Sequence, residues 1–91
     1  MPANETALLY LRDLGYLIRE AAVEAHRQSN RLQAEGTRDE FEMGRAVAYY
    51  EVASLMAQQA EAFGLDLSAL AFDGFDPDRD LLGAASGAGA A

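Results

Sequence analysis

Arg45, Tyr49 and Gln59 are the residues of this sequence best placed to do chemistry. If residues 38–63 form a helix, Arg45 and Gln59 project onto the centre of its main apolar stripe, with Tyr49 beside them. A buried polar group has to be paired, because leaving it unpaired costs about 1–3 kcal/mol. The simpler interpretation pairs Arg45 with Glu42 and bonds Gln59 across a dimer to fix its register. The alternative is a polar pocket between helices that binds a small anionic ligand.

His26, the only histidine, is a weak candidate for a metal ligand or a general base. Di-iron helical bundles use a Glu-x-x-His motif, and here Val23 occupies the position three residues before His26. A single histidine on a helix is expected to be an ordinary polar residue or part of an interface.

The alternating acids of "DPDRD", residues 76–80, suggest a calcium loop. An EF-hand loop that began at Asp76 would need Gly at its sixth position and Glu at its twelfth, where this chain has Leu81 and Gly87. Asp76 followed by Pro77 instead fits the start of a short helix. We therefore expect no metal, no cofactor and no catalytic residue.

The composition limits the class of partner. The chain has 91 residues, a net charge of −8 and seven basic residues, all of them arginine. Without a basic patch it is not expected to bind nucleic acid or an anionic membrane surface. There are no cysteines, which excludes disulfides and thiolate sites. We see no signal peptide and no membrane span, so a cytoplasmic location is the default expectation.

Two long helices must position these side chains. Apolar residues recur every three or four positions over residues 5–35 and again over residues 38–63, as one face of a helix requires. Gly36 and Gly64 are expected to end the two helices. The short connection predicts an antiparallel helical hairpin, so the fold class is all-α.

Two glycines inside these helices are expected to allow close packing. Folding the chain at Gly36 places Gly15 opposite Ala57 and Ala60, and Gly44 opposite Ala25 and Ser29. A glycine inside a helix costs about 1 kcal/mol, and close approach of the two backbones would explain why the cost is tolerated.

Residues 65–82 predict a short C-terminal helical arm. Ser68 is expected to cap a first helical turn and Asp76 a second one. The arm has apolar side chains that need cover, either on their own hairpin or on a partner subunit: Phe72, Phe75, Leu81 and Leu82. Residues 1–82 then form a single helical domain, and residues 83–91 form a flexible Gly/Ala tail.

The second helix is apolar on more than one side. Its main stripe is expected to face the first helix and consists of Phe41, Gly44, Ala48, Val52, Leu55 and Phe63, flanked by Tyr49, Met56 and Ala60. A helix that is apolar on two sides is buried on two sides. Its second stripe, with a mixed row on the first helix, therefore predicts a homodimer that forms a four-helix bundle. The interface candidates are Tyr16, Arg19, Val23, His26, Met43, Val47 and Tyr50.

These observations predict a small, acidic, non-catalytic protein–protein interaction module that acts as a homodimer. Such a module would be an adaptor, a regulator or an inhibitor, with itself and another protein as its partners. The prediction depends on the missing catalytic sets, the acidic charge and the surplus of apolar surface. The alternative is a ligand-binding or enzymatic helical bundle with its pocket around Arg45, Tyr49 and Gln59.

Overall fold

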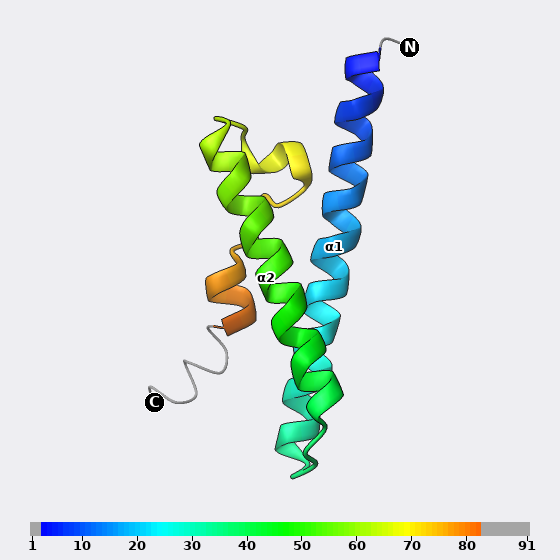
Figure 1. Cartoon of the computed structure of the whole chain (residues 1–91), viewed down its shortest axis with the longest axis vertical. Helices are drawn as coiled ribbons and strands as arrows, with labels where there is room; N and C mark the ends of the chain where they lie inside the picture. The colour runs from blue at the N-terminus through cyan, green and yellow to red at the C-terminus, as the bar shows by residue number, and fades with distance from the viewer. Residues whose placement is uncertain (1–2, 83–91) are drawn as a thin grey trace.

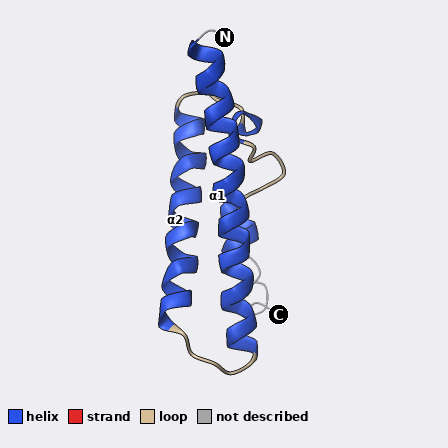
Figure 2. Cartoon of the chain, turned by 90° about the vertical axis from the view of Figure 1, so that its right-hand side faces the viewer, coloured by secondary structure: helices blue, strands red, loops and turns tan. Residues whose placement is uncertain are grey.

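Two long antiparallel helices form the body of the molecule (Figure 1). The computed structural model describes residues 3–82, and the tail predicted at residues 83–91 lies outside them. Helix α1 (Ala3–Ala34) and helix α2 (Glu40–Ala62) lie side by side, joined by a short loop (Figure 2). The described residues contain no strand. The prediction of an all-α helical hairpin is confirmed.

Both helices end where glycine was expected to end them. Gly36 and Gly64 have φ values of 75° and 68°, the left-handed region that glycine adopts without strain. The N–H of Thr37 donates to the carbonyl of Leu32 at 2.9 Å, which closes the last turn of α1. Asp39 caps α2, because its Oδ1 accepts the N–H of Glu42 at 3.0 Å.

The arm forms two short helical turns, η1 (Leu67–Leu70) and η2 (Asp78–Leu82). Asp66 caps η1 by accepting the N–H of Ser68 at 2.9 Å. The prediction that Ser68 caps this turn was wrong, because the turn begins one residue before it. Asp76 caps η2 as expected, since its Oδ1 accepts the N–H of Asp78 at 3.0 Å.

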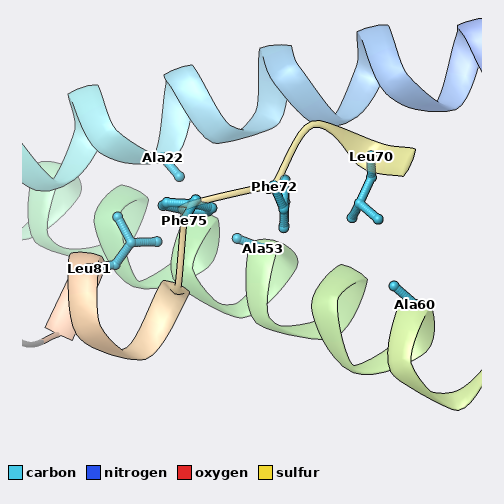
Figure 3. Close-up of a cluster of buried hydrophobic side chains, with 7 residues drawn as sticks. All are labelled: Ala22, Ala53, Ala60, Leu70, Phe72, Phe75 and Leu81. Carbon is cyan, nitrogen blue, oxygen red and sulfur yellow. The ribbon is translucent and has the colours of Figure 1, made fainter. Parts of the chain in front are cut away.

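The arm packs on the hairpin of its own chain. Phe72, Phe75 and Leu81 are buried against the two helices (Figure 3). Leu82 is half-exposed. The rings of Phe72 and Phe75 meet edge to face, with their centroids 5.1 Å apart. The buried residues that the helices contribute to this cluster are alanines, with larger side chains such as Leu11, Tyr49 and Met56 partly buried around them. The arm supplies the large side chains that are buried.

The face that α2 turns toward the core differs from the predicted one. Ala53 and Ala60 are its buried residues, whereas Phe41 and Phe63 of the expected main stripe are 73% and 77% exposed. The prediction was therefore wrong for the centre of the stripe, whereas the residues predicted to flank it, Tyr49, Met56 and Ala60, do pack in or against the core. Since α2 has apolar residues on almost its whole circumference, its sequence pattern does not indicate which face is buried. Its alanine side is buried because it leaves room for the large side chains of the arm.

Gly15 is a close-approach position, although its neighbour is not the predicted one. A Cβ added at Gly15 would lie 2.0 Å from the backbone oxygen of Leu70 in η1. At Gly44 an added Cβ would meet nothing within 4 Å, so its predicted packing role was wrong. Gly44 belongs to the stripe that α2 turns outward.

Candidate protein interface

The structure brings together two of the three predicted ligand-binding residues. Arg45 Nε donates to Glu42 Oε2 at 3.1 Å, and the guanidinium lies 5.9 Å from the ring centroid of Tyr49. Gln59 is fourteen residues farther along α2, about 21 Å at 1.5 Å per residue. The pairing of Arg45 with Glu42 predicted from the sequence is confirmed. One pocket cannot include both Arg45 and Gln59.

Arg19, a predicted interface residue, holds the arm of its own chain. Its Nη1 donates to the carbonyl of Ala71 at 3.0 Å and to that of Asp73 at 2.9 Å. The guanidinium also lies 5.1 Å from the ring centroid of Phe75, within range of a cation–π contact. Arg19 therefore fastens the turn between η1 and η2 to the middle of α1.

Tyr50, another interface candidate, is the second link between the hairpin and the arm. Its hydroxyl donates to Asp78 Oδ1 at the start of η2. The bond to the Asp78 carboxylate raises the pKa of Tyr50, because the protonated phenol is the form that donates.

The other interface candidates divide between the core and the surface. Val23 packs against the core cluster and Met43 is partly buried, whereas Tyr16 and Val47 are exposed. Asn30 Nδ2 lies 3.1 Å from His26 Nε2, one turn along α1. Burial lowers the pKa of His26, which favours the neutral ring. Much of the surface on which a second subunit was expected is thus occupied by the arm.

The opposite side of the hairpin is uncovered. We define the open face as seven large apolar side chains, three from α1 and four from α2, each more than a third exposed: Tyr10, Leu14, Leu17, Phe41, Val52, Leu55 and Phe63. Phe41, Val52 and Phe63 are spaced by eleven residues, or three turns, and so lie along one line of α2. At about 100° per residue, the α2 residues lie roughly opposite Tyr50 and the α1 residues lie roughly opposite Arg19. Since Tyr50 and Arg19 both bond to the arm, the two sets point away from it.

A small apolar hollow adjoins the open face at Phe63. It has a volume of about 170 Å³, lies between α1 and α2 over Leu70, and is lined by Met56, Gln59 and Phe63 among others. This volume is close to the roughly 150 Å³ of an apolar cavity that binds benzene. The open face therefore has both projecting aromatic rings and a depression of about the size of one ring.

The sequence identified the members of the α2 stripe but assigned the stripe to the wrong neighbour. The signal that could have corrected this is the composition of the arm, because Phe72, Phe75 and Leu81 are large side chains that become buried and need small neighbours. Small residues such as Ala53 and Ala60 are the ones that can accept them.

No family model, curated protein or solved structure matches this chain. None of the helices in the described residues is long and apolar enough to cross a membrane. Within residues 3–82, no group of three or more His, Cys, Asp or Glu side chains could hold a metal ion.

We predict that the stability of the folded chain depends on pH through Asp80 in the arm. Arg79 donates to both oxygens of Asp80 at 2.8 Å, and these bonds are the main reason why its pKa falls to about 2. In the unfolded chain Asp80 takes up a proton below about pH 4, whereas in the folded chain it does so only near pH 2. The stability that this carboxylate contributes is therefore present above pH 4 and is lost as the pH falls toward 2.

Melting curves between pH 2 and pH 6 test this dependence. Asp80→Asn should lower the melting temperature at pH 6 and flatten its fall with decreasing pH. Asp13→Asn removes an exposed carboxylate of α1 and serves as the control, with a curve parallel to that of the wild type. If Asp80→Asn also parallels the wild type, Asp80 does not stabilise the arm.

Proposed function

We propose that this chain is a small, acidic, non-catalytic protein-interaction module, and that its open face pairs with a second copy to form a four-helix bundle. The observation that carries the proposal is the open face itself. Monomeric proteins seldom expose large contiguous apolar patches, and such patches commonly mark interaction sites. The module would act as an adaptor, a regulator or an inhibitor in the cytoplasm.

The exposed aromatic residues make association favourable. Phe41 and Phe63 are about three-quarters exposed in the single chain. Burial of a phenylalanine side chain contributes about 1.5–3 kcal/mol. The open face therefore offers seven large, exposed apolar side chains for burial in a contact between two copies.

The size of the open face suits a stable pair. Helix α2 has 23 residues, which makes it about 35 Å long, and two packed helices are roughly 20 Å wide. The resulting footprint of roughly 700 Å² is close to the ~800 Å² per partner of a standard protein interface. A two-fold pair presents the same patch from both chains, so an aromatic ring of each copy can enter the hollow of the other.

The small-ligand alternative has less support. The guanidinium of Arg45 is already paired with Glu42, and Gln59 lies about four turns away from it along α2. A small anion would have to displace Glu42 to reach Arg45, without any help from Gln59.

Paired charge variants test the proposed interface. Leu17→Glu with Val52→Glu places two charges on the open face, which should weaken dimerisation by about 3 kcal/mol or more, roughly a hundredfold. Tyr16→Glu with Val47→Glu introduces the same charges at exposed positions outside the open face, and these are interface candidates from the sequence. Sedimentation velocity over a range of concentrations should show a monomer for the first pair of substitutions and a dimer for the second.

Two outcomes would contradict the proposal. If the Tyr16 and Val47 variant becomes monomeric instead, the interface lies on the side of the arm. If the wild-type chain stays monomeric at every concentration at which it is soluble, the open face does not pair with itself. Circular dichroism of each variant must show unchanged helix content, so that a loss of mass reflects dissociation rather than unfolding.

A further inference from the structure

A second concave surface lies between α2 and the arm, on the side away from the open face. It is a cleft of about 420 Å³. Leu65, Leu67 and Phe75 supply much of its apolar lining, and its charged residues are Glu61, Asp76 and Asp78. Every ionisable side chain that lines the cleft is therefore acidic.

These carboxylates keep oxygens free to bind a ligand. No hydrogen bond or ion pair joins the Glu61 carboxylate to another described residue. Asp78 uses Oδ1 to accept the hydroxyl of Tyr50, and Asp76 uses Oδ1 to accept the N–H groups of Asp78 and Arg79. The Oδ2 atoms of Asp76 and Asp78 accept no hydrogen bond from the described residues.

The nearby arginine makes no side-chain hydrogen bond to the cleft carboxylates, although its charge attracts that of Asp76. Arg79 follows Asp78 in the sequence, but its guanidinium donates to both oxygens of Asp80 and to the carbonyl of Gly74. The hydrogen bonds of the Arg79 guanidinium are therefore all made within the arm, to Gly74 and Asp80. The cleft is left with three carboxylates, an apolar lining and no cation of its own.

We propose that this cleft binds a basic segment of another protein, in which an apolar side chain stands next to an arginine or a lysine. The apolar side chain would lie on Leu65, Leu67 and Phe75. The cation would lie between Glu61 on α2 and Asp78 on the arm, where a guanidinium can bond to carboxylates on both walls. The net charge of −8 would speed the encounter with such a segment.

This second surface makes the chain a two-sided module. The open face would join two copies, and each copy would hold one basic segment in its cleft on the opposite side. Because the two surfaces lie on opposite sides of the hairpin, either proposal can fail while the other holds.

Fluorescence anisotropy with a defined peptide tests the cleft. The probe is a fluorescein-labelled Leu-Arg-Leu-Arg-Leu peptide at physiological salt, and the comparison peptide is Gly-Arg-Gly-Arg-Gly. Glu61→Gln with Asp78→Asn should weaken binding of the first peptide about tenfold, roughly threefold for each carboxylate removed. Asparagine at position 78 can still accept the bond from Tyr50, so the arm should stay in place and the melting temperature should hold.

A matched variant separates the cleft from the overall charge. Asp13→Asn with Glu20→Gln removes the same two charges from exposed positions on α1, and should weaken binding less than twofold. Three results would overturn the proposal. They are equal weakening by the two double variants, equal affinity for the two peptides, and loss of the dimer in the cleft variant, which would make the cleft part of the contact between copies.

Discussion

Gly15→Ala is expected to destabilise the chain by about 1–3 kcal/mol, the usual cost of forcing an extra methyl group into a packed site. The methyl carbon would lie 2.0 Å from the backbone oxygen of Leu70 and 2.8 Å from its carbonyl carbon. Neither atom belongs to a flexible side chain. To remove this clash, η1 would have to move away from α1, which would weaken the packing of the arm on the helices.

Gly44→Ala is the matched control, and its effect should have the opposite sign. Both glycines lie inside helices, and alanine favours a helix by about 1 kcal/mol over glycine. At Gly44 nothing lies within 4 Å of the added methyl group, so the gain in helix propensity is not offset by a clash. In a chain of this size, 1 kcal/mol corresponds to a shift of roughly 4–8 °C in melting temperature.

Thermal melts of the two variants at the same protein concentration give the comparison. The expected order of melting temperatures is Gly44→Ala above the wild type and Gly15→Ala below it. If both variants melt above the wild type, η1 does not press on α1 at Gly15. If both melt below it, the space around Gly44 is filled in solution, which would place Gly44 in the contact between two copies rather than at the surface.

The ends of the helices could be predicted from the sequence because their signals are local. Gly36 and Gly64 adopt the positive φ that closes a helix, and Asp39 and Asp76 cap the elements that follow them. Each signal involves neighbours within five residues, and so does the pairing of Arg45 with Glu42. Such features depend on the chain alone and not on the rest of the fold.

The arrangement of the faces could not be predicted in the same way. Helix α2 has apolar residues on most of its circumference, so burying Ala53 or burying Phe41 satisfies the periodicity about equally well. The choice depends on Phe72 and Phe75, about twenty residues farther along the chain, and on the bonds of Arg19 to their turn. The hydrophobic periodicity of a helix does not indicate such contacts with a distant segment of the chain.

Phe72→Ala is expected to have the largest effect of any single substitution proposed for this chain. Phe72 is 0% exposed and packs edge to face on Phe75 between the two helices. Truncation of a buried phenylalanine costs about 3–5 kcal/mol, because the lost burial adds to the cost of the cavity. The total stability of native proteins is about 5–15 kcal/mol, and a chain this small should lie toward the lower end.

Phe41→Ala removes the same side chain from the open face and is the control. Since Phe41 is 73% exposed, its loss should barely change the unfolding free energy of the single chain. Phe41→Ala should weaken association of the dimer. Because dilution dissociates the wild-type dimer as well, the melting temperatures of the variant and the wild type should approach each other as the protein is diluted. Phe72→Ala should instead melt far below the wild type at every concentration.

Urea titrations followed by circular dichroism, at a low and a high protein concentration, distinguish the two effects. A midpoint that falls with dilution in the wild type but not in Phe41→Ala would support pairing through the open face. A Phe72→Ala chain that unfolds at the wild-type urea concentration would show that the arm is not part of the folded core. The core would then consist of contacts between α1 and α2 themselves, including those of Leu11, Tyr49 and Met56.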